Sequence, residues 1–228
     1  MAAQDRGNDG VRTAKSGAQG RRRLPPHERE NMILEGATRF FARHGFAANL
    51  RDLASELNVS QALIFKYFAT KERLVEKVYD RTFLQRWRPE WEYTLTDGGL
   101  DLSHKLKRFY QSYLETVDDY IWIRIALLSG LTGNNLTQQY IVNNVGRLMV
   151  IIAREIRAAT GQDRDGEISM SEMEGVWLLH STFIYYLIRK HIYKTPVEMD
   201  RHIYVRATVD GFLEGILSVG RQDKHVVY

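Results

Sequence analysis

The segment Asn49–Phe68 constrains the fold of this chain most, because it combines two short helix patterns with a tight turn between them. The first pattern is one apolar stripe at helical spacing, made by Leu50, Leu53, Ala54 and Leu57. Asn58 follows where a sharp turn needs the left-handed backbone region, which Asn tolerates well. Ser60 can then cap a second helix, which Ile64 and Phe68 anchor to the interior. The arrangement predicts a helix-turn-helix motif, whose second helix enters the major groove of DNA.

The flanks of this motif carry further helix and cap signals. Met32–Phe46 upstream is a helix pattern that closes on a Gly-Phe pair, and Tyr67–Leu74 downstream is an aromatic pair followed by a capped Lys-Glu helix start. With the motif, these features resemble the DNA-binding domain of the TetR family of one-component transcription regulators, over about residues 28–80. The resemblance implies a dimeric regulator with a separate ligand-binding domain. Beyond residue 80 the family shares architecture rather than sequence, so the resemblance does not indicate a ligand.

Composition and charge agree with a DNA-binding protein. Residues 1–80 hold 14 Lys and Arg against 10 Asp and Glu, whereas residues 81–228 hold 18 of each, so the net charge of +4 arises in the segment that contains the motif. The chain has no cysteine, which rules out disulfides and thiolate metal sites. No apolar run reaches the roughly 20 residues of a membrane span, and the first residues lack the core of a signal peptide. We therefore expect a cytoplasmic protein.

Caps and periodicity predict an all-α fold of about nine helices, because the alternation typical of strands never persists. We expect a flexible basic tail at 1–24, a helix-turn-helix DNA-binding domain at 25–72, and a ligand-binding and dimerisation domain at 73–228. A linking helix should run from Thr70 to Trp91, with a bend at Pro89. Further helices are predicted at 102–117, 122–131, 135–159, 176–192 and from 196 onward. Capping boxes are expected before the last two, at Ser171 with Glu174 and at Thr195 with Glu198.

The second helix of the motif supplies the candidates for reading bases. Gln61 can pair with adenine through two hydrogen bonds, Lys66 has polar reach, and Ala62 can pack against a thymine methyl group. The alternative for Gln61 is a solvated residue in the first turn. Leu63 and Phe65 stand where the family often carries Thr and Tyr, so two hydroxyl contacts to phosphate are missing, and Phe65 is expected to be a core anchor instead.

Phosphate contacts are expected from residues around the motif. The resemblance assigns Tyr67 and Lys71 to phosphate binding, and Lys71 also stands at a helix N-terminus, whose amides favour anions. Asn49 and Arg51 are further candidates at the start of the preceding helix, and Ser60 at the start of the second. In the basic tail, an arm with Arg21, Arg22 and Arg23 can enter a minor groove or remain a solvated tail that attracts DNA without specificity.

Aromatic residues predict a pocket in the larger domain for an apolar or aromatic small molecule. The candidate lining residues are Trp87, Trp91, Tyr110, Tyr113, Trp122, Trp177, His180 and Phe183. Ordinary core packing is the alternative for each, and for His180 the alternative is a buried histidine with its hydrogen bonds satisfied. No metal ligand set is predicted there, because no second His or carboxylate stands four residues after His180. Arg124 can hold a ligand carboxylate or form an ion pair with Glu115 or Asp119.

The resemblance implies a homodimer that pairs through the last two helices. The helix at 176–192 is apolar over most of its circumference, and Gly211 and Gly215 in the final helix permit close approach. The expected interface residues are Tyr185, Ile188, Phe212, Leu213 and Ile216.

The sequence therefore favours a ligand-responsive, DNA-binding transcription regulator that binds a palindromic operator as a homodimer. A repressor is expected, although the sequence alone does not distinguish it from an activator. A non-enzymatic small-molecule sensor or carrier without specific DNA binding is the alternative. No cofactor is expected, and neither is catalysis, because the chain contains no phosphate-binding loop, nucleophile elbow, dinucleotide fingerprint or His-Glu-x-x-His motif.

Overall fold

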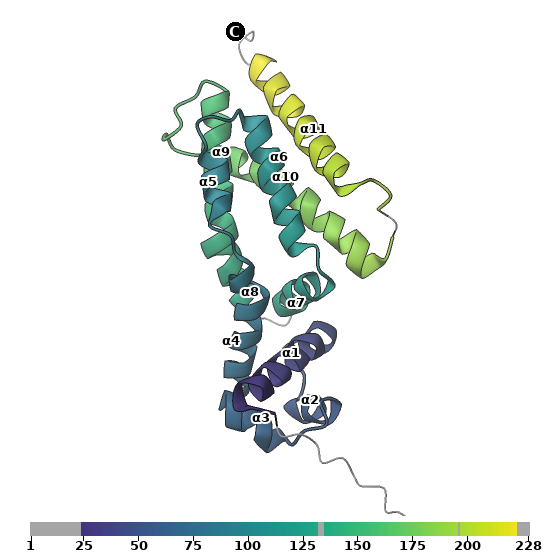
Figure 1. Ribbon diagram of the computed structural model, residues 1–228. Coiled ribbons are helices and arrows are strands. Elements are labelled where there is room, and N and C mark those ends of the chain that lie inside the picture. The colour runs from purple at the N-terminus through teal and green to yellow at the C-terminus, as the bar shows by residue number, and fades with distance from the viewer. Residues whose placement is uncertain (1–23, 132–134, 196, 223–228) are drawn as a thin grey trace, which may run out of the picture.

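The computed structural model describes residues 24–131, 135–195 and 197–222. In these ranges every regular element is helical and no strand occurs, which confirms the all-α prediction. Figure 1 shows a small N-terminal domain of three helices, joined through α4 to a larger helical domain. The three helices are α1 (Pro26–His44), α2 (Leu50–Glu56) and α3 (Gln61–Phe68).

Local backbone signals position α2 and α3 as the sequence predicts. Gly45 ends α1 with φ 76° and ψ 167°, and its amide donates to the Phe41 carbonyl. Asn58 adopts φ 52° in the turn between α2 and α3, which confirms the left-handed turn residue. The Ser60 hydroxyl accepts from the Leu63 amide at 3.1 Å, so the cap of α3 is also confirmed. The helix-turn-helix geometry therefore follows from three short-range features.

The predicted continuous linking helix from Thr70 to Trp91 is wrong. The chain instead forms α4 (Lys71–Thr82), a single 3-10 turn η1 (Leu84–Arg86) and α5 (Glu90–Thr96). Trp87 is extended, with ψ 133°, and Arg88 precedes Pro89, whose ring disfavours the helical conformation in the residue before it. Phe83 directly follows α4 as its C-cap residue and is buried at 1% exposure. The proline therefore explains why no helix continues through Arg88, whereas α4 has already ended at Thr82.

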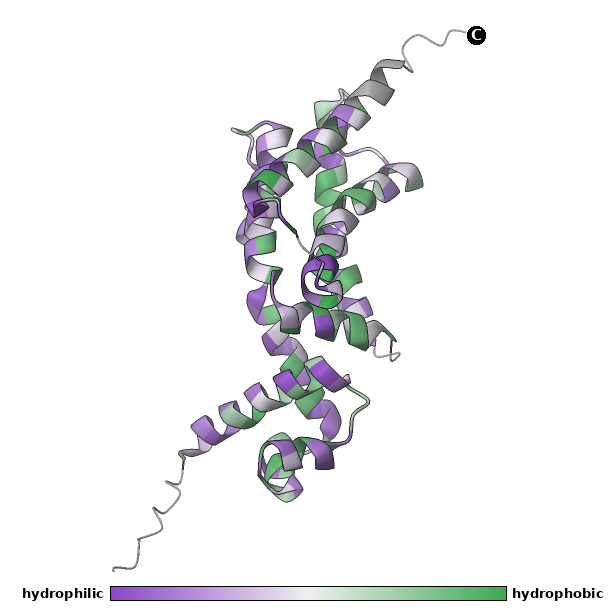
Figure 2. Cartoon of the chain, turned by 90° about the vertical axis from the view of Figure 1, so that its right-hand side faces the viewer, coloured by the Kyte–Doolittle hydropathy of each residue, from purple (hydrophilic) through white to green (hydrophobic). Residues whose placement is uncertain are grey.

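The larger domain contains helices that pack around an apolar interior. They are α5, α6 (Leu102–Val117), α7 (Tyr120–Leu131), α8 (Asn135–Tyr140), α9 (Gly146–Ala159), α10 (Met170–Leu187) and α11 (Arg201–Gln222). Two π-helical segments continue them: η2 (Ile141–Val145) joins α8 to α9, and η3 (Ile188–Tyr193) extends α10. Helix α6 packs against α5, α9 and α11, while α10 packs against α9 and α11. Figure 2 shows long apolar stretches, in green, within this domain.

Two predicted capping boxes are misplaced. The box before α10 is formed by Ser169 and Glu172, two residues before the expected pair Ser171 and Glu174. Both pairs have the same spacing, and Ser169 is the one whose backbone is extended as a cap requires. Helix α11 begins at Arg201, where Asp200 accepts from the amides of residues 202 and 203. The predicted start at Pro196 itself lies outside the described residues, but residues 197–200 are not helical.

Arg124 joins the two domains. It stands on α7, which packs against α1, and its Nε donates to the Ala42 carbonyl at 2.8 Å and its Nη2 to the Arg43 carbonyl at 3.0 Å. These carbonyls lie at the C-terminal end of α1, where the helix dipole favours a cation. The predicted ion pair of Arg124 with Glu115 or Asp119 is wrong, because Glu115 pairs with Arg201 at 3.5 Å and Asp119 with Arg86 at 3.6 Å.

Buried charges in the larger domain are paired. The Lys105 ammonium contacts the Glu155 carboxylate at 2.6 Å, and Arg164 binds the other oxygen of that carboxylate at 2.6 Å. Asp118, which caps α6, accepts from Lys190 at 2.6 Å and from His191 at 2.7 Å. These pairs connect α6 to α9 and to η3, so they fix the frame around the interior. Among the described helices, none is both long and apolar enough to cross a membrane.

The backbone of Gly45 generates a testable prediction. Its φ and ψ fall in a region that is essentially restricted to glycine. Gly45→Ala should lower the free energy of unfolding by about 1–3 kcal/mol. Asn58→Gly is the matched control, because glycine adopts the positive φ of that turn freely, and it should change stability by less than about 1 kcal/mol. Urea unfolding midpoints measure both effects, and equal losses in the two variants would contradict this account.

Candidate functional site

Helix α3 presents one face to the solvent. Ile64 and Phe68 are buried and anchor the helix, whereas Ala62, Phe65 and Lys66 are exposed. Gln61 is half-buried in the first turn, on the same side as the exposed residues because positions 61, 62, 65 and 66 are neighbours on a helix. The outward face thus combines an amide, a methyl group, an aromatic ring and an ammonium group.

The expectation that Phe65 is a core anchor is wrong. Its side chain is 39% exposed, on the same face as Lys66. The helix has only eight residues, and Ile64 and Phe68 already occupy the stripe that faces the interior. An apolar ring therefore remains on the face that the sequence assigns to DNA.

The candidate phosphate-binding residues have defined local roles. The Asn49 side chain caps α2 by accepting from the Arg51 amide at 2.9 Å, and Arg51 itself is exposed. The Lys71 ammonium donates to the Ala47 carbonyl at 3.1 Å, which holds the start of α4 against the loop before α2. Tyr67 is half-buried. The tail residues Arg21, Arg22 and Arg23 lie outside the described residues.

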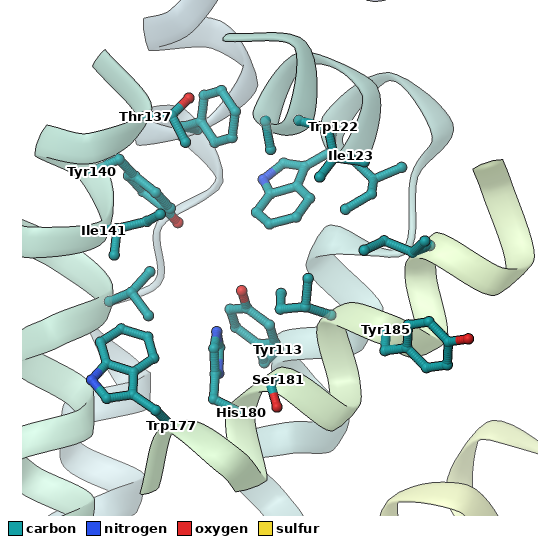
Figure 3. A pocket seen from close by; sticks show the side chains of 16 residues that line it. Tyr113, Trp122, Ile123, Thr137, Tyr140, Ile141, Trp177, His180, Ser181 and Tyr185 are labelled. Carbon is teal, nitrogen blue, oxygen red and sulfur yellow. The ribbon is translucent and has the colours of Figure 1, made fainter. Parts of the chain in front are cut away.

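The larger domain contains a partly open cavity of about 610 Å³. Its walls come from α6, α7, α8, η2, α10 and the first residue of η3, with Phe83 contributed from the end of α4 (Figure 3). No Asp, Glu, Lys or Arg is among the lining residues in the described part of the chain. Size and lining are typical of a site for a small apolar molecule.

The structure places half of the predicted pocket residues at this cavity. Tyr113, Trp122, Trp177 and His180 line it, and so do Tyr185 and Ile188, which the sequence assigned to the dimer interface. Trp87, Trp91, Tyr110 and Phe183 do not line it. Trp91 donates to the Ser112 hydroxyl at 3.0 Å, and the rings of Tyr110 and Phe183 stack with their centroids 4.0 Å apart.

The remaining lining residues were missed by sequence reasoning. They are Ile123, Ala126, Leu127, Thr137, Tyr140, Ile141, Val145, Ser181 and Ile184, whereas Phe83, which also lines the cavity, was among the aromatic residues from which the pocket was predicted. Most are aliphatic, and an aliphatic residue that faces a cavity has the same pattern as one that faces the core. One signal in the sequence indicated that α7 faces the cavity, namely its continuous apolar run, and a fully packed helix shows the same run.

Polar groups in the cavity wall are uncharged. Thr137 donates to the Ser129 hydroxyl at 2.8 Å, and Ser181 donates to the Leu178 carbonyl at 2.8 Å. His180 is surrounded by the rings of Tyr110, Tyr113 and Trp177, and burial lowers the pKa of its imidazole from 6.5 to about 4. Burial likewise raises the pKa of the Tyr113 phenol well above its ordinary value. The histidine is therefore neutral near pH 7. Within the described ranges, no three His, Asp or Glu side chains are grouped as a metal site requires.

Sequence comparison finds a family profile that matches part of the N-terminal domain. Residues 33–78 match the profile of the family described as bacterial regulatory proteins, tetR family. An HTH-type transcriptional repressor of Mycobacterium tuberculosis is 43% identical over 63 residues, which cover 26% of this chain and 34% of that protein. The HTH-type transcriptional regulator LuxR of Vibrio harveyi is 38% identical over 66 residues, 28% of this chain and 32% of that protein. The chain thus spans about a third of the length of these curated relatives.

Solved structures resemble the whole fold. A TetR-like transcriptional regulator from a Rhodococcus species matches with a TM-score of 0.56 and 17% identity, over 90% of this chain and 100% of the other. The TetR family transcriptional regulator PfmR from Thermus thermophilus matches with a TM-score of 0.58 and 19% identity, over 80% and 97%. At these identities the likeness shows the fold, an N-terminal helix-turn-helix domain followed by a helical domain.

The buried imidazole of His180 predicts a pH dependence of stability. The unfolded chain binds a proton near pH 6.5 and the folded chain only near pH 4. Between these values the unfolded state binds more protons, so the free energy of unfolding should fall as the pH is lowered, by on the order of 3 kcal/mol from this group. His180→Gln should remove that part of the pH dependence.

Urea unfolding of both proteins from pH 7.5 to 4.5 measures this effect. Any misfit of the glutamine shifts the variant's curve without changing its slope, so the comparison rests on slopes. Parallel curves for the two proteins would show that His180 takes up its proton in the folded state as readily as in the unfolded state.

Proposed function

We propose, from the premise that the N-terminal domain of this chain belongs to the TetR family, that the protein is a sequence-specific transcription regulator. It acts as a repressor, binds a palindromic operator as a homodimer and releases it when a small molecule enters the cavity. The observation that carries the proposal is α3, whose capped start and buried anchors leave Gln61, Ala62 and Lys66 on one outward face. A protein with this role works in the cytoplasm, where the DNA is.

The outward face of α3 supports direct reading of bases. Residues near the start of a recognition helix reach base edges in the major groove, and Gln61 is the first residue of α3. A glutamine amide can form two hydrogen bonds with adenine, which discriminates against other bases by about 1–3 kcal/mol. Phe65 and Ala62 add apolar surface that fits thymine methyl groups.

Gln61 and Lys71 should therefore affect DNA binding differently. Gln61→Ala should relax the preference at one base position, since it removes a base contact and leaves phosphate contacts intact. Lys71→Ala should weaken binding to all sequences alike and lower the slope of log K against log salt by about one unit. Fluorescence anisotropy on operator and random duplexes at several salt concentrations measures both.

Arg154→Ala is the charge-matched control for Lys71. Arg154 is exposed on α9 in the larger domain, so its loss removes one positive charge away from the DNA-binding helices. The salt slope should then stay unchanged. If Gln61→Ala weakened operator and random DNA equally, the base contact would be excluded.

Exposed apolar surface on α10 and α11 supports a dimer. Leu178 and Tyr185 are 69% and 54% exposed and lie seven residues apart, on one face of α10, while Ile203 on α11 is 48% exposed. Of the expected interface residues, Leu213 is only 8% exposed and packs inside its own protomer. Phe212 and Ile216 are half-buried. The exposed faces of the two helices, rather than Leu213, are available to a second copy.

Gly211 provides a clean test of this interface. It is exposed on α11, and a Cβ added there would meet no atom of its own protomer within 4 Å. Gly211→Glu should leave the protomer folded but place a charge in the apolar interface, producing monomers that bind a palindrome at least about tenfold more weakly. Gly130→Glu is the matched control, because Gly130 is an equally open, exposed helical position on α7. Light scattering that shows a dimer for Gly211→Glu would place the interface elsewhere.

Two structural connections link the cavity to the DNA-binding domain. Phe83 lines the cavity and directly follows α4, whose first residue is Lys71. Trp122 and Ile123 also line it, and the next residue, Arg124, binds the C-terminal carbonyls of α1. A ligand that prefers the DNA-incompetent arrangement by about 100-fold supplies about 2.7 kcal/mol per subunit. That is sufficient to release an operator held near its threshold affinity.

The experiment that tests the function is capture of pooled genomic fragments by the purified protein, followed by footprinting of those retained. A regulator protects a palindromic site, whereas the alternative, a small-molecule sensor or carrier without specific DNA binding, retains no sequence preferentially. Protection of a site upstream of the protein's own coding sequence would also identify a regulated promoter.

A further inference from the structure

Three polar atoms at the cavity wall have no hydrogen-bond partner. They are the Tyr113 hydroxyl, the Trp122 indole Nε1 and the His180 Nδ1, which we call the unpartnered groups. All three side chains line the cavity and are at most 4% exposed. A buried polar atom without a partner costs about 1–3 kcal/mol. By contrast, the Thr137 and Ser181 hydroxyls in the same wall are satisfied by the protein.

The chemistry of the unpartnered groups specifies what a ligand must offer. An indole N–H can only donate, and a phenol and a neutral imidazole can each donate one hydrogen. The rings of Tyr113 and His180 are neighbours, with centroids 5.2 Å apart, and Trp122 stands on the facing wall (Figure 3). In the tautomer that carries its proton on Nδ1, His180 forms a pair of donors with Tyr113 on one wall, and Trp122 is a single donor on the other. A ligand that matches this arrangement carries acceptors.

The absence of charge in the lining disfavours a ligand that buries an ionised group. None of the described lining residues is acidic, Lys or Arg, and His180 is neutral near pH 7. A carboxylate or an ammonium group would lose its water there and gain no counter-ion, which costs far more than one hydrogen bond returns. The rest of the lining is aromatic and aliphatic, so the body of the ligand is apolar.

Resting on the proposed function, we propose that the cavity binds a neutral, largely apolar molecule whose polar atoms are acceptor oxygens, of the ketone, ester or lactone class. One oxygen accepts from Tyr113 and His180. Trp122 donates to a second acceptor where the ligand has one. A cavity of about 610 Å³ has room for a molecule of two or three rings.

The test uses four probes with one diphenylmethyl skeleton, bound to the full-length protein at pH 7. Benzophenone carries a neutral acceptor, diphenylmethane has none, diphenylacetate is an anion and benzhydrylamine is a cation. Isothermal titration should show that benzophenone binds about fivefold or more tightly than diphenylmethane, the difference expected for a hydrogen bond to a waiting donor. The two ions should bind at least about tenfold more weakly than benzophenone.

Two conservative variants locate the hydrogen bond. Tyr113→Phe removes only the hydroxyl, so it should weaken benzophenone binding about three- to tenfold and leave diphenylmethane binding unchanged. Tyr110→Phe is the matched control, because the Tyr110 hydroxyl is also buried and unpartnered but does not line the cavity. Neither variant should lower the melting temperature, since each loses a hydroxyl that has no partner in the protein.

The ranking of the probes decides the proposal. Equal binding of benzophenone and diphenylmethane would overturn it, as would tighter binding of diphenylacetate or an equal loss for both neutral probes in Tyr113→Phe. Benzophenone and diphenylmethane would bind equally if an ordered water already formed hydrogen bonds with the unpartnered groups. DNA capture is a separate readout: retained operator with a flat ranking refutes only this inference, and the expected ranking without operator binding refutes only the regulatory function.

Discussion

The contact between Arg124 and the end of α1 ties the DNA-binding domain to the larger domain. A single guanidinium satisfies two carbonyls that the helix leaves without partners, at the end where its dipole is negative. Each such charge-assisted bond contributes about 1.5–3 kcal/mol. Because Arg43 also pairs with Glu56 of α2, the same helix end connects α7 to the helix-turn-helix motif. Arg124 therefore connects the helix-turn-helix domain to a part of α7 where the two preceding residues, Trp122 and Ile123, line the cavity.

The interior of the larger domain contains buried charges that are paired and, at the cavity, buried polar groups that have no hydrogen-bond partner. Lys105 with Glu155, and Asp118 with Lys190 and His191, pair every charge that they bury. Although burial opposes it, hydrogen bonds from Lys190 and His191 hold the pKa of Asp118 below its ordinary value. The Tyr113, Trp122 and His180 groups receive no such compensation. The paired charges stabilise the fold, which can therefore tolerate the free-energy cost of the unpartnered groups. Buried polar groups without partners are typical of a site where a ligand supplies the missing hydrogen bonds.

The sequence predicted the turns and helix caps that depend on neighbouring residues. It predicted burial and cavity lining only in part, since these depend on residues far apart in the chain. The turn at Asn58, the cap at Ser60 and the end of α1 at Gly45 follow from local backbone chemistry, and all are confirmed. Ser169 and Ser171 have the same spacing to a glutamate, and the structure shows that Ser169, with its extended backbone, is the cap. The exposure of Phe65 depends on how much room the core leaves for α3. Whether an aromatic residue faces the cavity, as Trp177 does, or the core, as Trp91 does, depends on the packing of several helices.

Two π-helical segments border the cavity, and they allow the helices there to change register. Ile141 and Val145 belong to η2 and Ile188 to η3, so both segments border the cavity. A π turn holds one residue more than an α turn, and each residue of an α-helix turns the chain by about 100°. If the π turn moved along the helix, each residue between its old and its new position would rotate by about 100° about the helix axis. Few backbone hydrogen bonds would be lost. Changes in helix register, rather than side-chain rotation alone, could thus exchange the residues that a bound molecule touches, in discrete steps.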